Sequence, residues 1–300
     1  MEFVTLSHRD QKGVYILGGL DEVLTLLEDN QVTLQTMMGS RFITGVQEQV
    51  ETWEKKLALL SETLDEWITV QRNWMYLETI FGSADIIRQL PGPAKTFQAV
   101  DKSWKNIMKH TNDEPNALMA GTKDRNRLEI FRTHNANLEQ IQKDLEEYLE
   151  TKRMAFPRFY FLSNDELLEI LSQSKDPLAV QQHLSKCFEN VNKLEFEPDL
   201  KMTAMYSGEG ERVDFQKSHY PEGSVEFWMT DILEEMKATV QWKIVESCKD
   251  YVTRDRNEWV LLWPGATIIA GSTIFWTLEV EEALNSAGHA GLVTYFDKSH

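Results

Sequence analysis

Residues 46–74 read VQEQVETWEKKLALLSETLDEWITVQRNW, and their large apolar side chains recur in alternating steps of four and three. This spacing places the apolar side chains on one face of an α-helix. The face comprises Val46, Val50, Trp53, Leu57, Leu60, Leu64, Trp67 and Trp74, with Gln71 as the one polar member. We therefore predict a helix from about Arg41 to Phe81, which at 1.5 Å per residue would be about 60 Å long.

A second long amphipathic helix is predicted from about Lys123 to Met154. Its face runs through Phe131, His134, Leu138, Ile141, Leu145, Tyr148 and Lys152. Phe156-Pro157 should end this helix, because the residue before a proline disfavours the helical conformation. Between the two helices, Pro91-Gly92-Pro93 and Pro115 predict a connector that contains one short helix around Trp104.

An aromatic run, FPRFYFL at residues 156–162, predicts a short, extended, buried segment. The run is either a core plug where helices meet or a joint between two helical subdomains, because a strand bends more readily than a helix. Ser163 and Glu166 have the spacing of a capping box, which should open the next helix. Asp176-Pro177 should start another helix, continuing to Val191.

The one clear strand signal lies at residues 200–215, where apolar residues alternate on both sides of Ser207-Gly208-Glu209-Gly210. This pattern predicts a β-hairpin, whose tip is either a solvated turn or an exposed contact for a partner. Ser224 should cap a helix that reaches Ile244, and Trp263-Pro264-Gly265 should form a turn before a short acidic helix at 279–284. The predicted fold is therefore mainly α: elongated, rod-like helical bundles with one small β-hairpin.

Composition narrows the classes of function. The 300 residues carry a formal net charge of −17, which disfavours nucleic acids and anionic membranes as partners because both require an excess of Lys and Arg. The two cysteines lack CxxC spacing and suit a reducing compartment. The polar residues 1–10 do not resemble a secretory signal, and the uninterrupted apolar part of residues 259–278 is far shorter than the ~20 residues of a membrane span. We expect a cytoplasmic protein.

Motifs for nucleotide or metal chemistry are incomplete. Gly13 and Gly18 have the glycine spacing of a phosphate-binding loop, but Gly19-Leu20 stands where the Lys and Ser/Thr should be, so we predict a turn. His183 and Cys187 share a helix face and could supply two metal ligands, but no second pair accompanies them. We expect a histidine at the rim of the core beside a buried thiol.

Other titratable residues have structural interpretations. His134 lies on the apolar face of the second long helix, where we expect a core or interface histidine. Adjacent acids such as Glu146-Glu147, Glu234-Glu235 and Glu281-Glu282 point in different directions on a helix, which predicts solvated faces. We therefore expect no catalytic residue, no metal ligand and no cofactor site, and hence no enzyme activity in this chain.

Several sequence blocks follow one another in a distinctive order. They are Leu34-Gln-Thr-Met-Met38, Val70-Gln-Arg-Asn-Trp-Met-Tyr-Leu-Glu78, Phe156 to Leu171 with its Ser-Asn-Asp-Glu core, Met205-Tyr-Ser-Gly-Glu-Gly-Glu211 and Trp259-Val-Leu-Leu-Trp-Pro-Gly265. Together they resemble the linker region of dynein heavy chains. The resemblance covers nearly the whole chain and is closer to single-headed inner-arm axonemal chains than to cytoplasmic dynein.

The resemblance implies a mechanical role. In the family, the linker is a rod of helical bundles that arches over a ring of AAA+ modules; it bends when the ring binds ATP, and its straightening is the power stroke of microtubule sliding in cilia and flagella. ATP and Mg would then belong to the downstream ring of the parent chain. The implied partners are that ring, other axonemal dynein subunits and, only indirectly, microtubules. The implied location is the cytoskeleton of the cilium or flagellum axoneme.

The resemblance also assigns regions of this chain. Residues 1–155 would form the N-terminal linker subdomains and 156–300 the C-terminal ones, truncated before the ring, so that we expect a fragment of a longer protein. The implied joint comprises Phe156, Pro157, Arg158, Phe159, Tyr160 and Phe161, with Arg158 as a polar anchor. The implied contact with the ring comprises Glu209, Gly210 and Glu211. The alternative is a static helical scaffold or partner-binding rod without a motor role.

Overall fold

The computed structural model describes residues 1–10, 13–124, 126–173 and 176–299. The chain divides into two compact units, Met1–Thr151 and Lys152–His300. The predicted mainly α-helical fold, with bundled helices and a small β element, is confirmed.

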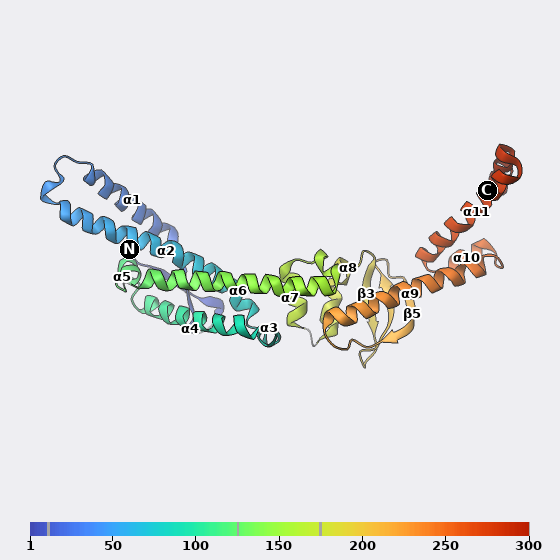
Figure 1. The fold of residues 1–300 in the computed structure, drawn as a ribbon, viewed down its shortest axis with the longest axis horizontal. Helices are drawn as coiled ribbons and strands as arrows, with labels where there is room; N and C mark the ends of the chain where they lie inside the picture. Colours follow the sequence, from blue (N-terminus) through green and yellow to red (C-terminus); the bar gives the residue numbers. More distant parts are fainter. Residues whose placement is uncertain (11–12, 125, 174–175, 300) are drawn as a thin grey trace. The chain divides into compact units, whose positions relative to one another are not determined.

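The first unit is a helical bundle with a small antiparallel sheet (Figure 1). Strands β1 (Val4–Ser7) and β2 (Tyr15–Gly18) form that sheet. The helices are α1 (Leu20–Met38), α2 (Gln47–Ile80), α3 (Ala84–Gln89), α4 (Pro91–Asp113), α5 (Ala117–Thr122) and α6 (Arg127–Ala155). Helix α6 continues by its last turn into the second unit.

Helix α2 is the predicted long helix, but it begins at Gln47 rather than near Arg41. Between α1 and α2 the chain reverses direction through a loop and a 3₁₀ turn at Ile43–Gly45. The residues expected to form the first turns of the long helix therefore belong to this connection. Two residues of the predicted apolar face, Val46 and Trp53, are exposed. Val46 is the N-cap of α2 and Trp53 lies in its second turn, at the end of the helix that Figure 1 shows beside α1.

The core of the first unit lies between α2, α4 and α6. The indole rings of Trp74 and Trp104 stack at 5.4 Å, and Trp67 lies 4.8 Å from the ring of Phe131. All four side chains are fully buried. Large aromatic side chains remove much apolar area from water, so these contacts hold the three helices together.

One expectation about the first unit was wrong, and one sheet was missed. The Pro-Gly-Pro sequence at 91–93 was expected in a connector with one short helix, but it forms the first turn of the 23-residue helix α4. A proline in the first turn of a helix loses no hydrogen bond. The N-terminal segment, for which no strand was predicted, contains the β1–β2 hairpin and α1. Gly19, at φ +57°, provides the left-handed conformation between β2 and α1.

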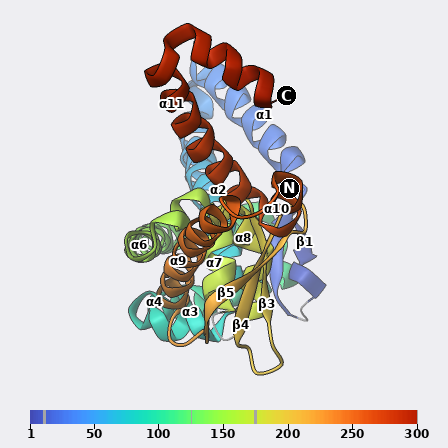
Figure 2. The same cartoon turned by 90° about the vertical axis from the view of Figure 1, so that its right-hand side faces the viewer.

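The second unit combines helices with a three-stranded sheet. Its helices are α7 (Asn164–Ser172), α8 (Leu184–Cys187), α9 (Val225–Tyr251), α10 (Arg256–Leu262) and α11 (Gly265–Ser299), with 3₁₀ helices η3 (Pro157–Phe161) and η4 (Pro177–His183). The sheet order is β3 (Val191–Phe196), β4 (Met202–Ser207), β5 (Arg212–His219), all antiparallel. Figure 2 shows α9 packed along β5.

The predicted hairpin is therefore part of a larger sheet. Strands β4 and β5 are the hairpin, and β3 adds a third strand on the other side of β4. The expected helix from Asp176-Pro177 to Val191 was wrong, because the chain forms η4 and the short α8 and then becomes extended at Phe188. The residues after Phe188 are extended because β3 pairs with β4. The spacing of apolar residues within the segment does not reveal such a distant partner.

The C-terminal helices follow the predicted break. Trp263-Pro264 separates α10 from α11. The expected short acidic helix at 279–284 lies inside the much longer α11, which has a kink at Ala287 and Gly288. Among the described residues, no helix combines the length and apolar character needed to cross a bilayer.

Candidate functional site

The aromatic run that follows α6 is a 3₁₀ helix, η3, and not the predicted extended segment. Pro157 occupies its first position, where the fixed φ of proline favours a helical turn. With three residues per turn, Phe156 and Phe159 fall on one side; both are fully buried, with ring centroids 4.9 Å apart. Tyr160 and Phe161 are exposed. The six predicted joint residues therefore include two aromatic anchors and two exposed aromatic rings.

Arg158 ties η3 to α8. Its Nη1 donates a hydrogen bond to the Cys187 carbonyl oxygen at 2.9 Å, and its guanidinium lies 4.9 Å from the ring centroid of Phe188. The Cys187 side chain is buried, and burial raises the pKa of its thiol to about 12, although the nearby Arg158 opposes the shift. This thiol therefore stays protonated and unreactive at neutral pH.

Two cations in the last turn of α6 make further contacts. Lys152 Nζ donates to Glu226 Oε1 on α9 at 2.5 Å, and both side chains are largely buried. Burial opposes ionisation of Glu226, but hydrogen bonds that include the one from Lys152 outweigh it and lower the pKa of the carboxyl. Arg153 Nη2 donates to the Leu162 carbonyl oxygen at 3.2 Å and to Asn164 Oδ1 at 2.8 Å. The end of α6 is thus bonded to both α9 and the start of α7.

The predicted capping box at the start of α7 is confirmed. The Ser163 N–H donates to Glu166 Oε2 at 2.9 Å, and the Glu166 N–H donates to Ser163 Oγ at 3.3 Å. Lys186 also donates to Glu166. The hydrogen bond from Lys186, followed by that from the Ser163 backbone, lowers the pKa of Glu166 to about 2.

The predicted contact at the hairpin tip makes an internal bond. The Gly265 N–H, at the start of α11, donates to Glu211 Oε1 at 2.9 Å. A carboxylate at a helix N-terminus satisfies a free N–H and complements the helix dipole. The turn itself is closed by the Gly210 N–H, which donates to the Ser207 carbonyl oxygen at 3.1 Å, and Gly210 has φ +87°. Glu209 and Gly210 are exposed.

One buried carboxylate was missed in the sequence. Glu235 was expected on a solvated face, but it is buried beneath β5. Its carboxylate accepts hydrogen bonds from the Lys217 N–H at 3.1 Å, from Thr239 Oγ1 at 2.8 Å and from His219 Nε2 at 3.1 Å. Burial opposes ionisation, but these bonds, led by that from His219, lower the pKa of Glu235. The carboxylate therefore fastens β5 to α9.

The other chemically suggestive residues do not form a ligand cluster. Cys187 is buried as expected, but His183 is buried as well, so the rim position expected for it was wrong. Within the described chain, no three His, Cys, Asp or Glu side chains gather in a way that could hold a metal ion. Gly18 ends β2 and Gly19 precedes α1, at the predicted turn. His134 is half-buried and its Nε2 lies 2.8 Å from Ser103 Oγ, and burial lowers its pKa.

The chain is thus a mainly helical segment made of two compact units. Side chains near the ends of helices and strands form hydrogen bonds with backbone groups of other elements. Residues 1–247 match the family described as dynein heavy chain, N-terminal region 2. The chain belongs to this family of dynein heavy chains.

Curated relatives are axonemal. The chain is 45% identical over 319 aligned residues to dynein axonemal heavy chain 6 of Homo sapiens, an alignment that covers 99% of this chain and 8% of that protein. It is 48% identical over 273 residues to dynein axonemal heavy chain 1 of Rattus norvegicus, covering 91% and 6%. It is 45% identical over 287 residues to dynein axonemal heavy chain 12 of Rattus norvegicus, covering 95% and 9%. The chain thus spans less than a tenth of the length of these relatives.

Proposed function

We propose that this chain is the lever, or linker, of an axonemal dynein motor, and that it changes shape at the end of α6. The observation that supports this most is the division of the chain between Thr151 and Lys152, within the last turn of α6. A boundary between compact units is where a chain bends at the lowest cost in lost contacts. A helix turn that carries this boundary is suited to act as a hinge.

The contacts suggest which side of the hinge stays fixed. Phe156 and Phe159 are held in the core of the second unit, and Arg158 binds the carbonyl of Cys187. Breaking this set would expose two aromatic rings, which costs several kcal/mol. We therefore place the movement in the last two turns of α6, at residues 149–155, and treat η3 as its fixed end. This refines the predicted joint, in which the aromatic run itself bends.

The energy for such a movement would come from elsewhere in the motor. ATP and Mg would bind in the AAA+ ring of the parent heavy chain, and that ring would be the principal partner of this segment. Other subunits of the axonemal dynein complex would be further partners, and microtubules would be reached only indirectly. The proposed location is the axoneme of a cilium or flagellum, consistent with the names of the relatives.

A matched pair of substitutions in η3 tests the lever in the full heavy chain. Phe159→Ala removes a fully buried anchor, whereas Phe161→Ala removes a ring that is 70% exposed in the same turn. We expect Phe159→Ala to lower microtubule gliding speed at least several-fold while ring ATPase continues, and Phe161→Ala to leave both near the parent values. Equal gliding speeds for the two variants and the parent would contradict the proposal.

A second measurement separates a lever from a static scaffold. Fluorophores are attached to cysteines introduced at the exposed positions Gln35 in the first unit and Lys237 in the second. Energy transfer between them is then compared in the full motor with an ATP analogue and without nucleotide. A lever requires a change in transfer efficiency between the two states. Identical efficiencies would refute the lever and leave the scaffold.

A further inference from the structure

A pocket of about 530 Å³ lies within the second unit, between the three-stranded sheet, α9 and the start of α11. A cavity of this size accommodates one small organic molecule. Its apolar lining comes from segments that are far apart in the sequence and includes Phe188, Met205, Val213, Met236, Val240 and Pro264. A molecule in the pocket would therefore contact apolar side chains from both the sheet and the helices.

Arg158, on η3, brings a half-buried cation to this lining. Its guanidinium donates a hydrogen bond to the Cys187 carbonyl oxygen and lies over the Phe188 ring, and these contacts hold it in place. Among the residues that the structure describes, no Asp or Glu forms an ion pair with it. A guanidinium has five N–H donors in a fixed fork that matches a carboxylate. An anionic ligand would therefore supply a partner that the described part of the chain does not.

Two carboxylates, those of Glu189 and Glu211, also line the pocket. The Glu211 carboxylate accepts a hydrogen bond from the Gly265 N–H at 2.9 Å, so the start of α11 already offsets its charge. Glu189 is exposed, and water weakens the field of an exposed charge. Neither carboxylate is therefore placed to cancel the charge of Arg158.

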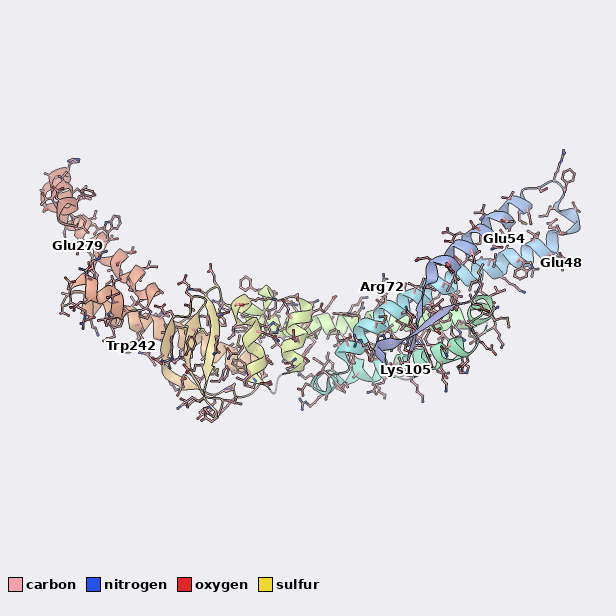
Figure 3. All side chains as sticks on the ribbon, turned by 180° about the vertical axis from the view of Figure 1, so that it is seen from behind. Glu48, Glu54, Arg72, Lys105, Trp242 and Glu279 are labelled. Carbon is pink, nitrogen blue, oxygen red and sulfur yellow. The ribbon has the colours of Figure 1, made fainter. Side chains whose placement is uncertain are left out.

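Two further cations reach the lining from α9. Lys237 Nζ donates to Glu234 Oε1 at 2.7 Å, but both side chains are more than half exposed, so this pair is weak. Lys243 Nζ lies 5.2 Å from the ring centroid of Trp242, which Figure 3 shows on α9. The lining thus carries three cations against two carboxylates, which favours a ligand with one negative charge.

We propose that this pocket binds a small amphipathic carboxylate of the class of medium-chain fatty acids. Its apolar chain lies against Met205, Met236 and Val240, and its carboxylate accepts hydrogen bonds from Arg158. The two methionines suit this role because the unbranched thioether side chain adapts to apolar chains of different shape. This binding does not depend on the proposed lever, and it would stabilise the second unit because the ligand contacts the sheet and the helices together.

Methyl signals of the methionines test the site directly, in the 300-residue chain labelled with ¹³C at each methionine methyl group and titrated with octanoate at neutral pH. Met205 and Met236 line the pocket, whereas Met202 and Met229 are fully buried in the same strand and helix outside the lining. We expect the signals of Met205 and Met236 to shift until they saturate, and those of Met202 and Met229 to stay in place. Absence of saturable shifts at Met205 and Met236 would overturn the proposal.

The head group is tested on the unaltered chain and then by substitution. Octylamine, which has the same apolar chain and a positive charge, should bind at least tenfold more weakly than octanoate. Arg158→Gln should weaken octanoate about tenfold, as expected for a charge-assisted hydrogen bond, and leave the neutral octanol unchanged. Arg212→Gln is the matched control, because Arg212 is an exposed arginine on β5 outside the lining.

Pocket volume is tested with Val240→Phe, which adds a ring to the lining and should weaken both octanoate and octanol. Circular dichroism establishes that each variant keeps its helicity. The proposal is overturned if octylamine binds as tightly as octanoate, or if Arg158→Gln and Arg212→Gln bind octanoate equally well. The comparison of octanoate with octylamine needs no substitution, so it decides the question even if Arg158→Gln does not fold.

Discussion

Replacing Gln71 by alanine should detach the N-terminal hairpin from the helical bundle. Gln71 interrupts the apolar face of α2, and its amide reaches β2, more than fifty positions away in the sequence. Its Oε1 accepts from the Leu17 N–H at 2.7 Å, and its Nε2 donates to the Leu17 carbonyl oxygen at 2.9 Å. One side chain thus pairs both backbone groups of a strand residue, as a neighbouring strand would do.

The size of the effect follows from these two bonds. Each hydrogen bond contributes about 1 kcal/mol net, and a polar group left unpaired in a buried place costs about 1–3 kcal/mol. Both bonds are partly buried, so water can replace some of what is lost. We expect Gln71→Ala to destabilise the attachment of β1–β2 by about 2 kcal/mol, which corresponds to a roughly 30-fold change in an opening equilibrium.

Hydrogen exchange followed by mass spectrometry measures this opening directly, because locally unfolding regions exchange in proportion to their opening equilibrium. Peptides that cover Leu17 should exchange roughly 30-fold faster in Gln71→Ala, while peptides of α6 stay unchanged. Gln35→Ala, an exposed position on α1, is the control. Gln71→Glu keeps the volume and one acceptor but sets a carboxylate against the Leu17 carbonyl, so it should open the hairpin as well. Protection of Leu17 that is equal in all four proteins would refute the reasoning.

Three further changes test other parts of the structure. In the native chain, iodoacetamide should modify the partly exposed Cys248 and spare Cys187, whose thiol is buried with its pKa raised to about 12; modification of both at equal rates would contradict the described packing. The pKa of Glu166 is about 2 in the folded chain and 4.5 ordinarily. The ionised carboxylate therefore contributes its full stabilisation above pH 4.5 and loses it as the pH falls toward 2. The free energies of unfolding of Glu166→Gln and the parent, measured with urea, should become equal near pH 2. Gly121→Ala should destabilise the first unit by about 1–2 kcal/mol in urea unfolding, because the added Cβ would lie 2.5 Å from a carbon of the fully buried Leu60; unchanged stability would show that Leu60 can move aside.

The sequence predicted those helices and turns whose conformation depends on interactions between residues close in the sequence. The apolar spacing of α2 and α6, the capping box at Ser163 and the hairpin around Gly210 all depend on residues within a few positions of one another. In each case, one conformation satisfies the backbone and buries the apolar side chains. Such elements can be read from the sequence without knowledge of the rest of the fold.

Elements that depend on distant partners could not be predicted in this way. Strand β3 exists because β4 lies beside it, and Phe188 leaves the helical conformation three residues before that pairing begins at Val191. The prolines at 91 and 93 are equally compatible with a loop and with the first turn of a helix, and burial of Phe97 and Trp104 decides for the helix. The prediction of an extended segment at residues 156–162 was wrong for a related reason. Within only five residues, the three-residue period of a 3₁₀ helix cannot be told from the two-residue period of a strand.

The candidate site shows the same division between local and distant interactions. Gln71, Glu211 and Glu235 were interpreted as an interruption, a tip and a solvated acid, yet each binds backbone N–H groups of another element. Apolar faces favour packing but tolerate sliding, whereas a hydrogen bond to a particular N–H has direction and fixes register. It follows that substitution of these three residues should alter how elements are placed and leave helix content nearly intact. For a segment proposed to transmit force between its ends, the fixed positions of its helices and strands matter more than its helix content. If these elements slide past one another, part of the movement at one end does not reach the other.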